Sequence, residues 1–331
     1  MTDEILLKLQ KDFPLEVRPF EVIAKQLKTS EQEVINTIKK QKENKIIRQT
    51  SAIFDTKSLG YNSSLVAFKL KDKHIDNAVD ILNSHPGITH NYERNHSFNI
   101  WFTVATSPNS VLGLEKTVQI LFKLTKADDH IVLPTLKLFK ISVKLDTTGK
   151  EAVKQKVAKI KKITINLSDK HIELIKLLQE DIDIVPEPFR HITQKLNISY
   201  DDFFDMINEL KQSGVMRRFA SILNHRKAGF NANAMVVWDI DETKAQTYGE
   251  KAAQYSAVSH CYLRPKYPQW RYNLFTMIHG KTKEDTQKVI NNIKQEIKAY
   301  EYMPLYSSRE FKKIRLKYFT NEEQIWESKY L

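Results

Sequence analysis

The segment RPFEVIAKQLKTSEQEVINTIKK (18–40) has a counterpart in the second half of this 331-residue chain, EPFRHITQKLNISYDDFFDMINE (187–209). The correspondence continues at one constant offset as far as Gly60 and Gly229. Two later pairs extend it: THNYER (89–94) with SHCYLR (259–264), and FNIWFTVAT (98–106) with YNLFTMIHG (272–280). Self-similarity at a fixed offset over this length indicates a duplicated domain.

Each copy is predicted to begin with a helix-turn-helix. Ser30 is placed as an N-cap, with Glu33 three residues later completing a capping box. The next apolar residues recur at helical spacing: Val34, Ile35 and Ile38. Three short helices with a tight turn between the last two are typical of this motif. The β-rich segments that follow, 46–54 and 215–223, favour a wing or a connecting hairpin.

After each helix-turn-helix, the pattern changes to strand, helix, strand, strand, helix, strand, which predicts a ferredoxin-like βαββαβ sandwich of the α+β class. The strands are expected near 63–70, 88–94, 98–106 and 131–144, and near 232–240, 258–264, 271–279 and 301–316. Helices are expected near 75–84, 110–126, 243–254 and 283–299. In FNIWFTVAT, the residues predicted to share one face are Phe98, Ile100, Phe102 and Val104.

The predicted organisation is therefore a tandem repeat of a winged helix-turn-helix and a sandwich. The predicted boundaries are 1–60 for the first head, 61–148 for the first sandwich, 149–165 for a Lys-rich linker, 166–229 for the second head and 230–331 for the second sandwich.

Composition narrows the class of protein. Hydrophobic residues make up 41% and charged residues 28%, as in a globular chain. The single cysteine, Cys261, excludes an intrachain disulfide and is expected to be a buried structural thiol. We find no signal peptide and no membrane-spanning run, so we expect a cytoplasmic protein. The sequence also has no Gly-rich phosphate loop, which argues against a nucleotide-binding loop of that type. The net charge of +12 suits a polyanionic partner: nucleic acid, anionic lipid or a small molecule with many carboxylates.

One polar cluster occurs in both halves. His90, Tyr92 and Arg94 alternate along a predicted strand, as do His260, Tyr262 and Arg264. Three further residues lie in the following turns or close the next strand of the second half: Lys266, Trp270 and His279. Histidine transfers protons near neutral pH, arginine binds carboxylates through paired hydrogen bonds, and aromatic rings offer flat apolar surfaces. The set suits a large, flat, acidic ligand.

Two other interpretations must be weighed. Alternating His, Tyr and Arg residues are often only the solvent face of an antiparallel sheet, and duplication copies surface residues too. The helix-turn-helix itself suggests DNA binding. However, the expected recognition helices begin with SEQE (30–33) and SYDD (199–202), and carboxylates there repel the DNA backbone, although acids also favour helix N-termini for structural reasons. The acidic helix N-termini therefore argue against DNA binding, and dimer packing or covering of the pocket are alternative roles for the heads.

Several long motifs resemble those of the siroheme decarboxylase family. They are the THNYER and SHCYLR regions with the strands that follow, FPLEVRPFEVIA (13–24), IIRQTSAIFDTKSLGYNSSLVA (46–67) and LYSSREFKKIRLKYF (305–319). The resemblance covers nearly the whole chain. It implies two related subunits, each similar to Lrp/AsnC regulators, fused here into one polypeptide. It also implies removal of two acetate carboxylates from siroheme to give 12,18-didecarboxysiroheme and carbon dioxide, a step toward heme d1 or heme b.

If siroheme is the substrate, its flat apolar faces and its rim of carboxylates suggest roles for named residues. The candidate proton donors are His90, His96 and His260. The candidate substrate-binding residues are Arg48, Tyr92, Arg94, Arg217, Arg218, Tyr262, Arg264, Lys266, Trp270 and His279. No cofactor or metal site of the protein's own is expected, because siroheme brings its iron, which one histidine could ligate. The expected partners are siroheme and its product, without a membrane.

Five points stay open at this stage: whether a second copy of the chain associates, which half holds the active pocket, which histidine ligates iron or donates the proton, which heme pathway uses the product, and whether the heads retain any DNA binding. The alternative functions are a ligand-sensing DNA-binding regulator of the Lrp/AsnC type and a siroheme- or heme-binding protein without turnover.

Overall fold

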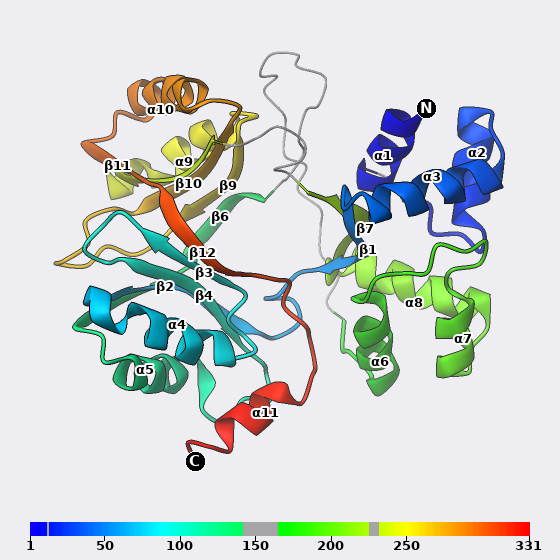
Figure 1. Ribbon diagram of the computed structural model, residues 1–331, viewed down its shortest axis with the longest axis horizontal. Helices are drawn as coiled ribbons and strands as arrows, with labels where there is room; N and C mark the ends of the chain where they lie inside the picture. The colour runs from blue at the N-terminus through cyan, green and yellow to red at the C-terminus, as the bar shows by residue number, and fades with distance from the viewer. Residues whose placement is uncertain (12, 142–164, 225–231) are drawn as a thin grey trace. The chain divides into compact units, whose positions relative to one another are not determined.

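The computed structural model describes residues 1–11, 13–141, 165–224 and 232–331, which form two compact units (Figure 1). The first, the helix-turn-helix unit, contains the described residues of 1–61, 160–228 and 317–320. The second, the sheet unit, contains those of 62–159, 229–316 and 321–331. The two predicted heads thus share one unit, and the two predicted sandwiches share the other. The predicted linker, 149–165, lies outside the described residues except for its last residue.

The helix-turn-helix unit contains two sets of three helices. They are α1 (Thr2–Lys11), α2 (Pro19–Leu27) and α3 (Glu31–Glu43), then α6 (Asp169–Leu178), α7 (Arg190–Leu196) and α8 (Tyr200–Gln212). The Ser30 side chain accepts a hydrogen bond from the Glu33 N–H, which confirms the predicted N-cap. The Glu33 carboxylate contacts Thr29 instead of completing a capping box. In the second copy, Ser199 and Asp202 do form the complete box.

The predicted wing or connecting hairpin is wrong. Strand β1 (Ile47–Phe54) pairs antiparallel with β7 (Met216–Leu223) of the other copy, so the two copies share one two-stranded sheet. Both strands have the same burial pattern, and their central residues are buried. The buried hydroxyls of Thr50 and Ser221 lie 2.6 Å apart and satisfy each other. The strand of each copy therefore provides backbone hydrogen-bond partners for the strand of the other copy.

The sheet unit contains two helix-covered sheets. The first half contributes β2 (Asn62–Lys69), α4 (Ile75–Ser84), β3 (His90–Arg94), β4 (Ile100–Thr106), α5 (Gly113–Thr125), β5 (Asp129–Pro134) and β6 (Lys137–Ile141). The second half contributes β8 (Ala232–Asp239), α9 (Ala245–Ala253), β9 (Val258–Leu263), β10 (Leu274–Gly280), α10 (Lys283–Ile297), β11 (Glu301–Leu305), β12 (Ser307–Lys313) and α11 (Glu322–Glu327). Short 3₁₀ turns at Asp72–His74 and Glu242–Lys244 precede α4 and α9.

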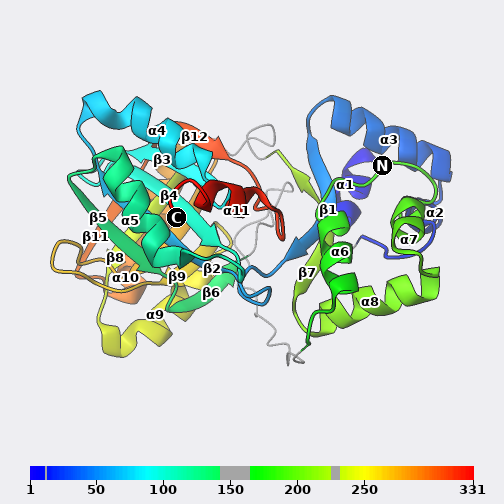
Figure 2. The same ribbon diagram turned by 90° about the horizontal axis from the view of Figure 1, so that it is seen from below.

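The two halves exchange their last strands, which corrects the prediction of single strands over 131–144 and 301–316. The sheet orders are β12-β3-β4-β2-β5 and β11-β8-β10-β9-β6. Strand β5 ends at Pro134, which has no N–H to continue the ladder, and β6 then pairs with β9 of the other sheet. In the same way β12 leaves its own half and pairs with β3 (Figure 2). Each sheet therefore has five strands instead of four.

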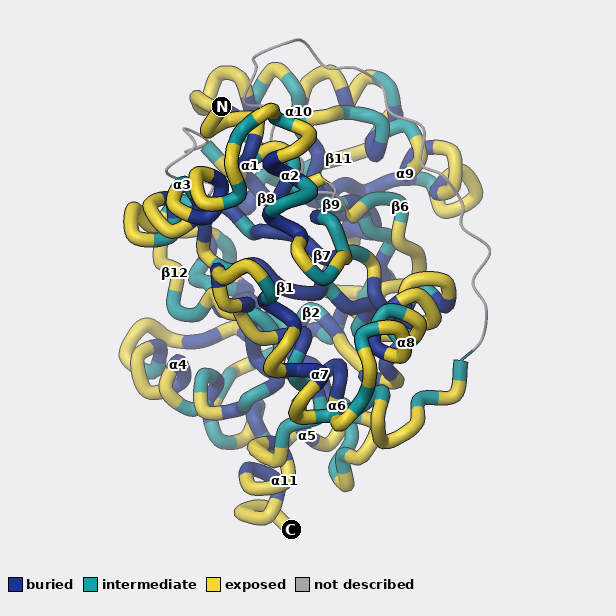
Figure 3. The backbone as a smooth tube through the Cα atoms, turned by 90° about the vertical axis from the view of Figure 1, so that its right-hand side faces the viewer, coloured by how far each residue is buried: buried dark blue, intermediate teal, exposed yellow. Residues whose placement is uncertain are grey.

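Three apolar clusters define the layers of the sheet unit. One lies between the first sheet and α4 and α5, and another lies between the second sheet and α9 and α10. The third is built from residues of both sheets, including Trp101, Leu133, Val237 and Phe275, and is called the inter-sheet layer here. The helices turn buried sides toward the sheets and exposed sides outward (Figure 3).

The face prediction for the first half is partly confirmed. Ile100, Phe102 and Val104 share one face, as predicted, and this face lies under the helices. Phe98 packs in the inter-sheet layer instead, because it precedes the first residue of β4 and does not follow the alternation of that strand. Cys261 is fully buried, as predicted, under the helices that cover the second sheet, and it lies on the opposite face from His260. None of the described helices has the combination of length and apolarity needed to traverse a bilayer.

The C-terminal helix α11 covers the N-terminus of α5. The buried Glu327 carboxylate accepts hydrogen bonds from the backbone N–H groups of Val111 and Leu112, at 3.0 and 3.3 Å. Trp326 packs against the fully buried His85, with ring centroids 4.5 Å apart. A carboxylate at a helix N-terminus satisfies unpaired amides and interacts favourably with the helix dipole.

His85 is expected to make the sheet unit acid-labile. Burial, with a smaller contribution from Lys312, lowers the pKa of His85 from 6.5 to about 4. The unfolded chain therefore takes up a proton before the folded chain as the pH falls, so stability is lost between pH 6.5 and about 4. The expected decrease in the free energy of unfolding is about 3 kcal/mol.

Chemical unfolding followed by tryptophan fluorescence tests this prediction, since all four tryptophans lie in the sheet unit. The His85→Asn variant keeps an acceptor for the Gly87 N–H, which now lies 3.0 Å from His85 Nδ1. It is expected to lose most of the pH dependence in this window. An unchanged pH dependence in the variant would assign the acid lability to another group.

Candidate functional site

The clustered His, Tyr and Arg residues of the first half face the second sheet. On β3, His90 lies opposite Thr103, and Tyr92 lies opposite Trp101 of the inter-sheet layer. Cross-strand partners share a face, so His90, Tyr92 and Arg94 all point toward this layer. Asn91 points the other way and contacts Asn83 of α4.

The second half repeats the arrangement on β9. His260 lies opposite Met277, and Tyr262 lies opposite Phe275. Both partners belong to or pack against the inter-sheet layer. The two clusters therefore lie on the inward faces of the two sheets, and the solvent-face interpretation does not hold for them.

Two buried arginines are the most unusual groups of the site. Arg94 is 6% and Arg264 is 8% exposed. Arg94 Nη1 donates to the Leu305 carbonyl at 2.8 Å, and Arg264 Nη1 donates to the Leu133 carbonyl, so each arginine reaches the other half. The Nε of each has no partner among the described residues.

Neither arginine forms an ion pair with a carboxylate in the described parts of the chain. Each guanidinium instead lies near a tyrosine ring, Tyr92 at 5.3 Å and Tyr262 at 4.9 Å from the ring centroid. Burial lowers the pKa of each arginine to about 10, so both remain cationic at neutral pH. A buried cation without a carboxylate is costly unless an anion is bound.

A hydroxyl group orients each strand histidine. In the first half, Thr89 Oγ1 lies 3.0 Å from His90 Nδ1 and 3.0 Å from Thr103 Oγ1. In the second half, Ser259 Oγ lies 2.8 Å from His260 Nδ1 and 2.6 Å from His279 Nε2. His279 Nδ1 in turn lies 2.7 Å from Asn233 Oδ1. His279 thus reaches His260 through Ser259.

His96 and Trp270, which come from different halves, meet at the edge of the inter-sheet layer. Their rings are T-shaped with centroids 5.4 Å apart, and Trp270 also packs against Trp101 at 5.2 Å. His96 Nδ1 accepts the Phe98 N–H, and burial lowers the pKa of His96. The buried Trp270 Nε1 has no acceptor among the described residues.

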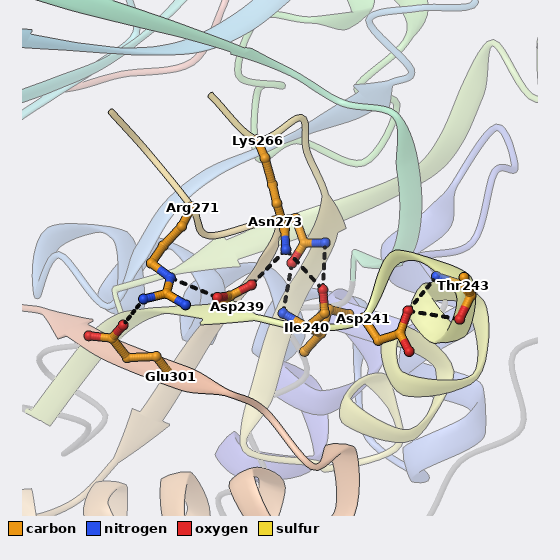
Figure 4. A network of polar contacts seen from close by, with 8 residues as sticks. All are labelled: Asp239, Ile240, Asp241, Thr243, Lys266, Arg271, Asn273 and Glu301. Atoms are coloured by element: carbon orange, nitrogen blue, oxygen red, sulfur yellow. Dashed lines mark hydrogen bonds and ion pairs between the residues drawn. The ribbon is translucent and has the colours of Figure 1, made fainter. Parts of the chain in front are cut away.

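Lys266 is already paired within the protein. Its Nζ lies 2.6 Å from the buried Asp239 carboxylate and 3.2 Å from the Ile240 carbonyl (Figure 4). Arg271 binds the other oxygen of Asp239 and also Glu301. This network supports the end of β8, so Lys266 is less suited to the substrate than the sequence pattern indicated.

The remaining predicted residues belong to the helix-turn-helix unit. Arg217 pairs with Asp55. Burial raises the pKa of the Asp55 carboxyl group, but the hydrogen bonds from Ser58 and then Arg217 outweigh it and lower that pKa overall. Arg48 is exposed and Arg218 is half-buried, and no ion pair or hydrogen bond of either is found in the described residues. Desolvation, followed by the nearby Arg217 charge, lowers the pKa of Arg218.

Comparisons with known proteins identify the family. Residues 3–48 and 171–217 match the family model of the siroheme decarboxylase NirDL-like HTH domain, and residues 58–140 and 227–312 match that of the AsnC-like ligand binding domain. A siroheme decarboxylase of Hydrogenobacter thermophilus is 38% identical over 98% of this chain and 96% of its own. This chain belongs to the siroheme decarboxylase family. The resemblance predicted from the sequence motifs is thereby confirmed.

Two further matches are with a relative that corresponds to one half of the chain and with a crystal structure of a co-complex. The siroheme decarboxylase beta subunit of Methanosarcina barkeri is 42% identical over 43% of this chain and 93% of its own, so it matches about one half. The crystal structure of the siroheme decarboxylase NirDL in co-complex with an iron-uroporphyrin III analogue matches with a TM-score of 0.79 at 32% identity. The match covers 99% of this chain and 97% of that one.

The sequence patterns did not reveal the residues that orient the site histidines through hydrogen bonds, directly or through a neighbour: Thr89, Thr103, Ser259 and Asn233. One signal was present, because a hydroxyl residue precedes the histidine in both THNYER and SHCYLR. Within the residues that the structure describes, no group of three or more His, Cys, Asp or Glu side chains could hold a metal ion.

Proposed function

We propose that this chain is a siroheme decarboxylase that removes two acetate carboxylates from siroheme, giving 12,18-didecarboxysiroheme and two molecules of carbon dioxide. Family membership supports the reaction, and the two buried arginines support the substrate. Siroheme is a flat disc with apolar faces and a rim of carboxylates. Arg94 and Arg264 offer cations without a carboxylate partner, beside the aromatic rings of Tyr92 and Tyr262.

The arginines suit the carboxylates that stay on the macrocycle. A guanidinium donates in a fixed fork that matches a carboxylate, and each Nε still lacks an acceptor in the described structure. Stabilising a carboxylate that must leave would oppose its loss, so the reacting acetates require a less cationic environment. Trp270, Tyr92 and Tyr262 would then contact the faces of the disc.

Proton transfer completes the chemistry. Protonation of a pyrrole carbon makes the ring an electron acceptor. The bond between the methylene and carboxyl carbons then breaks, its electron pair enters the ring, and carbon dioxide leaves. The methylene carbon takes a proton while the ring carbon returns its own, so each acetate becomes a methyl group without any oxidant or reductant. No cofactor of the protein is therefore required.

His90, His96 and His260 are the proposed proton carriers. Imidazole transfers protons near neutral pH, and proton transfer by a positioned side chain accelerates a reaction about 10²- to 10⁴-fold. His96 accepts a backbone N–H at Nδ1, so its neutral form carries the proton on Nε2 and can donate it. A histidine of the site that is not used for proton transfer could ligate the substrate's iron. The product would serve heme d1 or heme b synthesis.

Anaerobic incubation of the full chain with siroheme, followed by mass analysis, tests the proposal. The expected result is loss of the mass of two carbon dioxide molecules, with heat-denatured protein as the control. Unchanged siroheme in the presence of folded protein would refute the proposed activity. Bound siroheme with its spectrum but without decarboxylation would indicate a carrier, and salt-sensitive binding of genomic DNA would indicate a regulator.

A further inference from the structure

His260 belongs to a series of side-chain hydrogen bonds with a defined direction, called the relay here. Four side chains from three strands follow one another: Asn233 of β8, His279 of β10, and Ser259 and His260 of β9. The three connecting distances are 2.7, 2.6 and 2.8 Å, all within the range of good hydrogen bonds. Ser259 is buried, while His260 and His279 are half-buried.

Asn233 determines the direction in which each hydrogen bond of the relay is donated. Asn233 presents Oδ1, which can only accept, so His279 Nδ1 must carry a proton. A neutral His279 then accepts at Nε2, and the Ser259 hydroxyl must donate to it. The Met277 carbonyl is the alternative acceptor for this hydroxyl, but it lies at 3.4 Å, against 2.6 Å for His279 Nε2. With its proton used, Ser259 can only accept from His260 Nδ1.

We infer that Asn233, His279 and Ser259 are positioning residues that hold neutral His260 in the tautomer with the proton on Nδ1 and the lone pair on Nε2. The inference deepens the proposed function, and its catalytic meaning rests on that function. His260 would then accept a proton through Nε2 during the reaction. In other enzymes that transfer protons through a histidine, the rate falls by a large factor when the group that fixes the histidine tautomer is replaced.

The hydroxyl contacts described for His90 in the first half do not impose this constraint. The hydroxyls of Thr89 and Thr103 follow His90, and each can donate or accept. The sixth residue of the seven-residue strand is His279 in β10 but Ala105 in β4. The Thr89 and Thr103 hydroxyls therefore do not by themselves fix the tautomer of His90. The contacts of Ser259 and His279, in contrast, assign His260 the role of a proton acceptor.

Side-chain nitrogen NMR of the full chain, labelled with ¹⁵N-histidine and free of siroheme, tests the inference. The spectra distinguish protonated from unprotonated ring nitrogens in neutral imidazole. They are recorded above the pH range in which histidines titrate, and the His260→Gln variant identifies the His260 signals. The expected pattern for His260 and His279 is a protonated Nδ1 and an unprotonated Nε2. A proton on His260 Nε2 would overturn the inference.

Matched variants separate positioning from folding. Asn233→Ala is expected to give mixed tautomers of His260, whereas Asn233→Asp, which can only accept, keeps the original pattern. Thr103→Val, in the first half, is the control and leaves the His260 signals unchanged. An unaltered His260 pattern in Asn233→Ala, with a native near-ultraviolet circular dichroism spectrum, would contradict the relay.

Turnover provides the second measurement. Asn233→Ala is expected to lower kcat about tenfold or more with little change in KM, and Asn233→Asp to restore it. If the native chain leaves siroheme unchanged but His260 shows the expected tautomer, the proposed function fails and the relay stands. If siroheme is decarboxylated and His260 is protonated on Nε2, only the relay fails.

Discussion

The His260→Ala variant is expected to decarboxylate siroheme at least about 100-fold more slowly than the native chain. His260 lies on the inward face of the second sheet, and the groups around it favour one direction of proton transfer. Alanine removes the proton carrier without removing the buried arginines, so siroheme binding is expected to change much less than turnover. Single-turnover mass analysis under anaerobic conditions, with a parallel binding titration, gives both quantities.

His191→Ala is the matched control. His191 is an exposed histidine in α7 of the helix-turn-helix unit, and it should be replaceable without loss of rate. A His260→Ala variant with native turnover would show that another residue transfers the proton. A loss of turnover fully explained by weaker binding would instead make His260 a binding group.

The Arg264→Met variant is expected to bind siroheme about tenfold to 100-fold more weakly, the range that a hydrogen bond to a charged group spans. Methionine keeps much of the apolar volume but removes the cation next to Tyr262. It also leaves the buried Leu133 carbonyl without its donor, which should cost about 1–3 kcal/mol of stability. Arg94→Met should behave similarly, because Arg94 holds the equivalent Leu305 carbonyl.

Titration of siroheme absorbance and chemical unfolding measure the two effects separately. Arg309→Met serves as the control, because Arg309 lies on exposed β12 and pairs with Glu93 and Asp76. Exposed ion pairs contribute about 0–1 kcal/mol, so this variant should bind and fold almost as the native chain does. Native siroheme affinity in folded Arg264→Met would remove this guanidinium from the substrate site.

Local sequence patterns predicted the elements of the fold well but not the exchange between the halves. The helix of 75–84 and the Ser30 cap depend on neighbouring residues, and both were predictable. Pro134 marks the end of a strand, yet it says nothing about where the chain goes next. The pairing of β6 with β9, and of β12 with β3, depends on which sheet edges lie nearby in the folded chain.

In the candidate site, too, local patterns were predictable from the sequence, whereas contacts between strands and between halves were not. Alternation predicted that His90, Tyr92 and Arg94 share a face, but periodicity cannot say whether that face meets water or a second sheet. The contact between His96 and Trp270 joins two halves, and the pairing of Lys266 with Asp239 joins two strands, so neither follows from spacing in the sequence. The carbonyl partners of the arginines, Leu305 in β11 and Leu133 in β5, each belong to the half opposite the arginine, so spacing in the sequence does not reveal these contacts either.

A crystal structure of the full chain with siroheme bound would test the central claim most directly. We predict that the macrocycle lies against the inward sheet faces, with rim carboxylates within hydrogen-bond distance of the Arg94 or Arg264 guanidinium and a ring face against Tyr92 or Tyr262. A macrocycle bound elsewhere, with both guanidinium groups still contacting only backbone carbonyls, would contradict the account.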